Sequence, residues 1–227
     1  PENILHCLGR RLQPLGYSIR SCVVDLSNYG VPHHRERLIT IGCRIPKITD
    51  VIPIKKDIFS KELSPFHAKP THGIQCENQL ISLRKAIGHL PALDSQARLK
   101  DSSDPFHCIP KWNNRQYFWM KHTPEGKSAF ANLICPKCSY HNKKNESVLC
   151  EKCGTALPRP SLFSNGKYRL IKGFKTSYRR MEWDRVASTL TLNSGVISSD
   201  MKGHPEQNRV LSLREILILS TLDHPLW

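Results

Sequence analysis

The sequence predicts an α/β fold in which a short stretch of a sheet domain is followed by a long, loop-rich region. Apolar residues recur at helical spacing within residues 3–15, which predicts a helix that ends at Gly16. Two apolar stretches, residues 17–26 and 37–44, flank a tight turn and predict two strands, the second of them apolar enough to be buried. Residues 46–172 are instead rich in proline, histidine and lysine. The order helix, strand, turn, strand is typical of the late part of an α/β sheet domain.

Charge and length limit the classes of function. The 227 residues carry 34 Lys and Arg against 19 Asp and Glu, a net charge of +15. Such an excess favours nucleic acid as the partner, because each neutralised phosphate releases counterions, and charge alone does not separate DNA from RNA. No apolar run approaches the roughly 18 residues of a membrane-spanning helix, and the N-terminus does not resemble a signal peptide. We expect a cytoplasmic protein that associates with nucleic acid and has no membrane partner.

Four cysteines form the pattern C-x2-C-x11-C-x2-C, a specific signature of a metal site. Four thiolates complete a tetrahedron, so the pattern predicts a structural Zn²⁺ in a ribbon over residues 133–156; a catalytic zinc or a redox pair is the alternative. Such a ribbon either staples a loop or contacts nucleic acid. The predicted ligands are Cys135, Cys138, Cys150 and Cys153. The isolated cysteines are expected to be small core residues: Cys7, Cys22, Cys43, Cys76 and Cys108.

Two arginines follow the turn between the predicted strands. Residues 29–32 (YGVP) combine a glycine with a proline, which is a turn signature, and Arg35 and Arg37 come next. Side chains at i and i+2 of an extended chain point the same way, so both guanidinium groups can converge on one phosphate, carboxylate or base edge. The alternative is a solvated, charged strand end.

The block GVPHHRERLITIG resembles GVPQxRxRxxxxG of the DNA (cytosine-5) methyltransferases, mostly bacterial enzymes. Three later segments also resemble that family: QLISLRKAIGHLPAL, YRRMEWDRVASTLTLNSG and HPEQNRVLSLREILILSTLDHP. The resemblance implies the C-terminal part of an S-adenosylmethionine-dependent methyltransferase sheet domain, residues 1–45. It implies an inserted target-recognition domain with the zinc ribbon at 46–172, and a return strand and helix at 173–227.

The resemblance also implies roles for individual residues. In the family the second arginine of the block binds O2 of the flipped cytosine, which by position is Arg37, while Arg35 takes the supporting place and His33 replaces a glutamine. Double-stranded DNA is the expected partner. Contacts are expected from Arg115 and Lys121, beside aromatic side chains at 112–119, and from the segment at 173–227 that contains the return strand. Packing is the alternative role for those aromatic residues. The expected contacts in that segment are Arg179 and Arg180.

The last predicted helix is indicated by its own residues as well as by the resemblance. Ser212 and Glu215 have the spacing of a capping box at the start of an apolar-faced helix. Arg214 is expected to form a salt bridge there rather than to contact phosphate.

Two family motifs are absent from the sequence: the FxGxG turn that binds S-adenosylmethionine and the Pro-Cys dipeptide that holds the nucleophile. Glu2-Asn3-Ile4 is similar to the family's Glu-Asn-Val but lies too near Gly16, and it is expected to start the helix. We therefore expect an inactive half-enzyme of a restriction-modification type methyltransferase, completed by a second polypeptide, or a truncated product. The alternatives are a non-catalytic, sequence-specific DNA-binding protein or regulatory remnant of such an enzyme and, less favoured, an RNA-binding zinc-ribbon protein.

Overall fold

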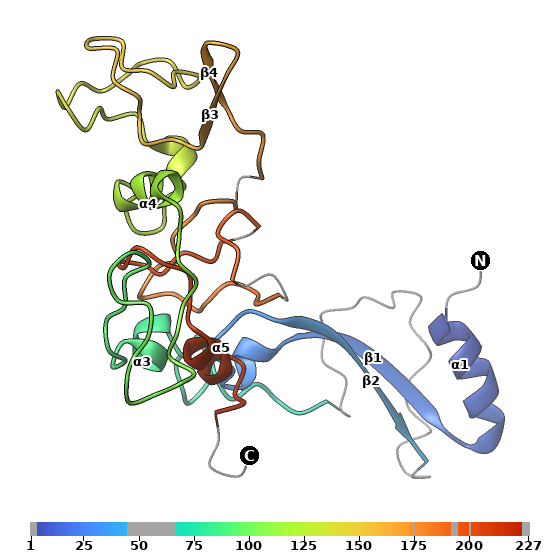
Figure 1. Cartoon of the computed structure of the whole chain (residues 1–227). Coiled ribbons are helices and arrows are strands. Elements are labelled where there is room, and N and C mark those ends of the chain that lie inside the picture. Colours follow the sequence, from blue (N-terminus) through green and yellow to red (C-terminus); the bar gives the residue numbers. More distant parts are fainter. Residues whose placement is uncertain (1–3, 45–66, 175, 192–194, 200, 224–227) are drawn as a thin grey trace. The chain divides into compact units, whose positions relative to one another are not determined.

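The computed structural model describes residues 4–44, 67–174, 176–191, 195–199 and 201–223 (Figure 1). The chain divides into two compact units, residues 1–80 and 81–227, which are described separately below. In the described ranges no helix has the length and apolar character needed to cross a membrane. Glu2 and Asn3, and the domain boundary expected at residues 45–46, lie outside the described residues.

The first unit contains the predicted helix, strand, turn and strand. Gly16 ends the helical segment with a left-handed backbone (φ 82°), a conformation that glycine adopts without a steric penalty. The predicted helix over residues 3–15 and both strands are confirmed, with small shifts of their ends. The elements are α1 (Ile4–Leu12), η1 (Gln13–Leu15), β1 (Ser18–Asp25), η2 (Leu26–Tyr29) and β2 (Glu36–Cys43).

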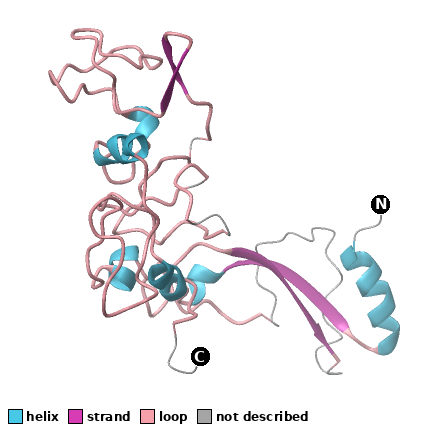
Figure 2. Ribbon diagram, viewed as in Figure 1, coloured by secondary structure: helices cyan, strands magenta, loops and turns pink. Residues whose placement is uncertain are grey.

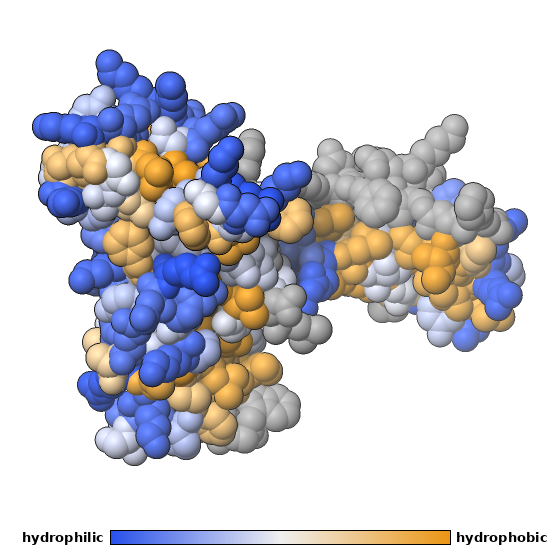
Figure 3. Space-filling model, turned by 45° about the horizontal axis from the view of Figure 1, so that its top comes forward, coloured by the Kyte–Doolittle hydropathy of each residue, from blue (hydrophilic) through white to orange (hydrophobic). Residues whose placement is uncertain are grey.

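Strands β1 and β2 form a two-stranded antiparallel sheet, in register from Ser18 opposite Cys43 to Asp25 opposite Glu36. The expectation of a buried second strand is wrong for this structure, since Leu38 and Ile39 of β2 are 40% and 37% exposed. Among the described residues the two strands pair only with each other, and His67 Nε2 lies 3.1 Å from Ile39 O of β2. Apolar side chains are accordingly visible on the surface of this hairpin (Figure 3).

The second unit consists mostly of loops that connect short elements (Figure 2). Within residues 79–93, the segment QLISLRKAIGHLPAL that resembles the family, α3 covers five residues. Because the expected return strand around residues 189–191 makes no ladder, it is a loop, and that expectation is wrong. The elements are α3 (Leu83–Ile87), α4 (Asn114–Lys121), η3 (Ala129–Ala131), β3 (Ser161–Ser164), β4 (Lys167–Leu170) and α5 (Leu213–Leu219).

Besides a small apolar cluster around Cys135, Cys150 and Leu157, two larger clusters hold the second unit together. One joins α3 and α5 with the loop around Trp183, and the other joins α4 and η3 with Tyr178 and Val210. Both clusters draw on residues that are distant in the sequence, so the loops of this unit are fixed by packing as well as by hydrogen bonds. Packing also explains two of the aromatic residues near α4, since Trp112 and Trp119 are each only 5% exposed.

Helix α5 begins with the predicted capping box. Ser212 Oγ accepts a hydrogen bond from Glu215 N, and a Glu215 carboxylate oxygen accepts one from Ser212 N. Both partners are buried. Arg214 forms ion pairs with Asp104 and Asp223, which supports the structural role expected for it.

The isolated cysteines differ from one another. Cys22 is fully buried, as expected, whereas Cys108 is exposed and its assignment to the core is wrong. Cys108 lies in a loop, where its backbone forms an isolated bridge with Lys100. Cys7, Cys43 and Cys76 are half-buried.

Candidate functional site

The turn that carries the arginine block is organised by the carboxylate of Asp25. Its Oδ1 accepts hydrogen bonds from the backbone N–H groups of Ser27 and Arg35, both at 3.0 Å, and its Oδ2 lies 2.8 Å from His34 Nδ1. Burial alone would raise the pKa of Asp25, but these hydrogen bonds together lower it. Asp25 therefore stays ionised and fixes the backbone at the entrance of β2.

Gly30 shapes the same turn. It has a left-handed backbone with φ 89°, and a Cβ at this position would lie 2.9 Å from His72 Cε1. Residues 67–78 pack against the turn. The backbone N–H of His72 donates to Asn28 O, and the hydroxyl of Tyr29 donates to Ala68 O. Glycine is required at this position on two grounds, backbone conformation and space.

The two arginines sit at the end of this ordered turn. Arg35 is half-buried and immediately precedes β2, while Arg37 is exposed and lies opposite Val24 of β1. Arg37 Nη1 donates to the carbonyl oxygen of Glu36 at 2.7 Å. His33, which replaces the family's glutamine, is buried. The backbone of the block is thus held in place, and the side chain of Arg37 is presented at the surface of the first unit.

The second candidate site is the cluster of four cysteines. Their ligand atoms all lie within 4.8 Å of one another, with 3.5 Å between Cys135 Sγ and Cys153 Sγ and 3.6 Å between Cys138 Sγ and Cys150 Sγ. These distances are too long for a disulfide. They approach the roughly 3.8 Å edge of a tetrahedron built on Zn–S bonds of about 2.3 Å. The cluster therefore fits a tetrahedral metal ion.

The backbone around the cluster turns so that the four cysteine side chains converge. Each C-x2-C pair is followed by a residue with a left-handed backbone, Ser139 (φ 56°) after the first pair and Gly154 (φ 72°) after the second. Buried Asn142 links the two halves, because its Nδ2 donates to Leu133 O at 2.8 Å and its Oδ1 accepts from Glu151 N at 2.7 Å. Asn142 thus ties the loop of the first cysteine pair to the loop of the second.

Arg159 connects the cysteine loops to the rest of the second unit. Its Nη1 donates to Ser147 O at 2.6 Å, and its Nε donates to Phe130 O at 2.9 Å. Burial lowers the pKa of this guanidinium. Asn132 adds a further link through a 2.8 Å hydrogen bond to Pro158 O. These contacts anchor the loop, which supports the stapling role.

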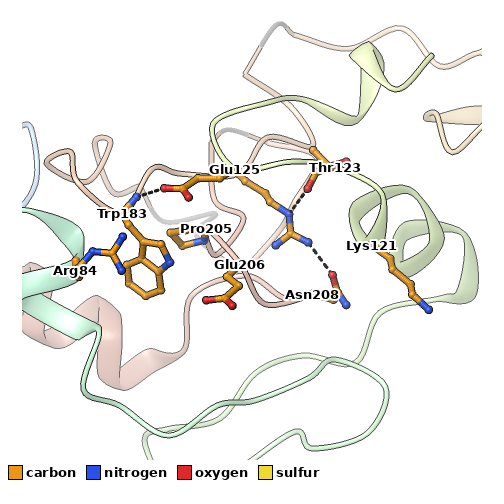
Figure 4. Close-up of a pocket in the computed structure, with 9 residues that line it drawn as sticks. Arg84, Lys121, Thr123, Glu125, Trp183, Pro205, Glu206 and Asn208 are labelled. Carbon is orange, nitrogen blue, oxygen red and sulfur yellow. Dashed lines mark hydrogen bonds between the residues drawn. The ribbon is translucent and has the colours of Figure 1, made fainter. Parts of the chain in front are cut away.

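A cleft with a volume of about 610 Å³ lies near α4 in the second unit (Figure 4). On one side the guanidinium of Arg84 lies 5.3 Å above the ring of Trp183, and Glu125 Oε1 accepts from the backbone N–H of Trp183 at 2.5 Å. Cationic and acidic side chains both line the cleft, so charge alone does not select an anion there. The lining residues are Arg84, Lys121, Thr123, Glu125, Arg180, Trp183, Pro205, Glu206 and Asn208.

The side chains expected to contact DNA differ in exposure. Arg115 and Lys121 lie exposed on α4, and Arg179 is half-buried with its Nε bonded to Gly126 O. Arg180 is 3% exposed. Its direct contact with DNA remains a prediction that this geometry does not favour.

All five N–H donors of Arg180 are used by the protein itself. Its guanidinium donates to four carbonyl oxygens and to one side-chain amide oxygen, at distances between 2.6 and 2.8 Å. Burial lowers the pKa of Arg180 to about 10. The acceptors are Met120 O, Thr123 O, His204 O, Gln207 O and Asn208 Oδ1.

The model of the C-5 cytosine-specific DNA methylase family matches residues 2–225. The chain belongs to this family. The match extends over both units, including the arginine block, the cysteine cluster and the capping box of α5.

Two relatives are similar along almost the whole chain. A type II methyltransferase of Avibacterium volantium, M1.HgaI, is 30% identical over 217 residues, covering 91% of this chain and 46% of that protein. A type II methylase of Herpetosiphon aurantiacus, M.HgiDII, is 25% identical over 212 residues, covering 92% and 46%. This methylase-family chain therefore spans about half the length of the curated relatives it matches.

Two features of this methylase-family chain were not predicted from its sequence. The positioning role of Asp25 depends on acceptor geometry, although an Asp before a turn is a common capping signal. The hairpin of β3 and β4 was also missed. Its signal was Asn165-Gly166, a dipeptide that favours tight hairpin turns.

Proposed function

We propose that this chain provides the cytosine O2 contact and the target-recognition region of a DNA (cytosine-5) methyltransferase. The observation that carries the proposal is the arginine block, whose backbone Asp25 fixes while Arg37 remains exposed. The family match over residues 2–225 supports it. Double-stranded DNA is the proposed substrate, consistent with the net charge of +15.

Methyl transfer to C5 requires groups that this sequence lacks. A thiolate must attack C6 of a cytosine flipped out of the duplex, and the family holds that thiolate in a Pro-Cys dipeptide. S-adenosylmethionine supplies the methyl group when it is bound. We infer that nucleophile and cofactor site lie outside these 227 residues, in a second polypeptide or in further sequence of a longer protein, because the relatives are about twice as long.

Arg37 has a defined part in this chemistry. Attack at C6 places negative charge on the pyrimidine ring, and a guanidinium at O2 stabilises that charge. Loss of one such preorganised donor typically costs about 10²- to 10³-fold in rate. Arg35 is proposed to support Arg37 from the adjacent turn, with its own backbone held by Asp25.

The cysteine cluster is proposed to hold a structural Zn²⁺ through Cys135, Cys138, Cys150 and Cys153, whose sulfurs already converge. Four protein ligands leave no open coordination position, so this metal would stabilise the recognition region rather than activate water.

Reconstitution tests the proposed function. The chain would be combined with the first half of a full-length family member that carries FxGxG and Pro-Cys, and transfer of labelled methyl groups to duplex DNA would be measured. We expect Arg37→Ala to abolish most transfer while duplex binding persists. Arg11→Ala, which removes an exposed arginine of α1, is the matched control. Full activity of Arg37→Ala would overturn the catalytic role.

A non-catalytic DNA-binding protein is the second candidate, favoured by the missing Pro-Cys dipeptide. It predicts that no first half restores methyl transfer, although the chain binds duplex DNA with an affinity that falls steeply with salt and does not depend on Arg37.

A further inference from the structure

The hairpin of β3 and β4 is built on a two-residue turn. Asn165 and Gly166 both have left-handed backbones, with φ 52° and 73°, which is the conformation of the turn type that matches the twist of antiparallel strands. The pairing runs from Ser161 opposite Leu170 to Ser164 opposite Lys167. The local sequence therefore defines both the turn and the register of this hairpin.

The two faces of the hairpin differ in chemistry. On one face, Phe163 and Tyr168 form a cross-strand pair with ring centroids 4.8 Å apart. Such pairs stabilise a hairpin. The other face carries Leu162 opposite Arg169 and Ser164 opposite Lys167, and we call these four residues the basic face.

Both faces are open to solvent. Leu162, Phe163 and Tyr168 are 39%, 60% and 42% exposed, and none of them belongs to an apolar cluster of the second unit. A two-stranded hairpin with exposed apolar side chains is marginal by itself, and contiguous exposed apolar groups commonly mark an interaction surface. At its base the hairpin is fixed, since Ile171 N donates to Pro160 O at 2.9 Å.

The charge around the hairpin has one sign. The sequence from Lys152 to Met181 contains no Asp or Glu, while Lys167, Arg169 and Lys172 lie in or next to the hairpin. Both strand cations are exposed. A ligand with repeated negative charge is complementary to this surface. A phosphate backbone would neutralise its positive charge more completely than an acidic or neutral protein surface.

We propose that the basic face of the β3–β4 hairpin contacts duplex DNA by entering the major groove. A two-stranded ribbon fits the roughly 12 Å width of that groove, where Arg and Lys bind phosphates or guanine edges and an apolar side chain contacts the thymine methyl group. Lys167 and Arg169 supply the cations, Leu162 supplies the apolar contact, and the aromatic pair keeps the ribbon rigid. The inference rests on the proposed function, because it names the element that reads the DNA.

A paired substitution tests the role of the hairpin. The Lys167→Gln/Arg169→Gln variant removes two cations from exposed positions and leaves the turn and the aromatic pair intact. Lys85→Gln/Lys100→Gln removes two exposed lysines elsewhere in the same unit and is the matched control. Anisotropy of a fluorescein-labelled duplex of about 30 base pairs would be measured between about 50 and 300 mM KCl.

We expect the slope of log affinity against log salt to become shallower by about 1.8 in the hairpin variant, since each lost phosphate contact contributes about 0.9. The control should keep the parent slope. Equal slopes for the two variants would overturn the inference, as would a parent chain that does not bind duplex DNA.

The methyl-transfer experiment separates this inference from the proposed function. DNA binding that depends on the hairpin, with no methyl transfer from any added first half, would overturn the enzymatic proposal and support the hairpin. Methyl transfer by the reconstituted parent, with unchanged DNA binding by the hairpin variant, would overturn the hairpin alone. In that case the exposed faces of the hairpin would bind another partner, such as a protein.

Discussion

Arg209 and Glu215 form a doubly hydrogen-bonded ion pair inside the second unit. Arg209 Nη1 donates to Glu215 Oε2 at 2.6 Å and Nη2 donates to Oε1 at 2.8 Å, while each side chain is 1% exposed. Glu215 Oε2 also accepts from Ser212 N, so the same carboxylate closes the capping box of α5. One acidic side chain thereby ties the start of the helix to the preceding loop.

Glu215→Gln should destabilise the second unit strongly. The substitution leaves the Arg209 charge buried without its counter-charge, which typically costs about 3 to 5 kcal/mol. Urea unfolding followed by tryptophan fluorescence would measure the change. Glu146→Gln, at an exposed position, is the control and should stay within about 0.5 kcal/mol of the parent. A similarly small effect of Glu215→Gln would contradict a stabilising role for the ion pair.

Metal removal should loosen the loops around the cysteine cluster. Atomic absorption is expected to find about one zinc ion per chain, because four thiolates complete one tetrahedral site. Cys135→Ser should lose the metal and become sensitive to proteolysis within residues 133–156. Cys108→Ser changes an exposed cysteine outside the cluster and should retain both metal and protease resistance. Equal metal content in the two variants would refute the assignment.

His204 should make the protein less stable in mild acid. Burial, together with the nearby charges of Arg209 and Arg180, lowers the pKa of His204 to about 2, from an ordinary value of 6.5. Between these values the unfolded chain binds a proton that the folded chain excludes. The free energy of unfolding therefore falls as pH drops below about 6.5, by up to about 1.4 kcal/mol per pH unit from this group.

His204→Asn isolates that contribution. The Nδ1 of His204 accepts hydrogen bonds from the backbone N–H groups of Glu206 and Gln207, and an asparagine carbonyl oxygen can take over this role without titrating. Urea unfolding of both proteins between pH 7.5 and pH 4.5 should show a flatter profile for the variant, by about 1.4 kcal/mol per pH unit below pH 6. Parallel profiles would show that His204 does not couple folding to protons.

Asp25 should control the arginine block without touching the reacting base. Asp25→Ala removes the acceptor shared by the backbone N–H groups of Ser27 and Arg35, and is expected to reduce methyl transfer by the reconstituted enzyme about 10-fold or more. Asp25→Asn keeps an oxygen at the Oδ1 position and should retain most activity. If both variants were equally active, the turn would not depend on this side chain.

The predictable parts of the structure were those with local signals. Gly16 ended the first helix, Ser212 and Glu215 defined a capping box, and the spacing of four cysteines anticipated their convergence. Each signal lies within one continuous stretch of the chain, so it can be recognised without knowing which distant residues pack together.

The other features depend on residues far apart in the chain. Arg180 looked like a candidate for DNA contact because its sequence neighbours are basic, but its acceptors come from residues 120–123 and 204–208. Exposure of Leu38 and Ile39 could not be read from their apolar character, since burial depends on what packs against a strand. The β3–β4 hairpin carried a local signal in Asn165-Gly166, and its role required knowledge of which faces remain uncovered.

Four acceptors of Arg180 are main-chain carbonyl oxygens, which determines which substitutions the surrounding residues tolerate. Every amino acid has a main-chain carbonyl group, so the loops that converge on this arginine can exchange most of their side chains and still offer the same acceptors. Lys121 at the end of α4, and Glu125 and Glu206 in the loops, are exposed beside these acceptors. Substitutions at these three exposed positions should therefore leave the hydrogen bonds of Arg180 in place, so the surface around the cleft can change while the backbone beneath it stays fixed.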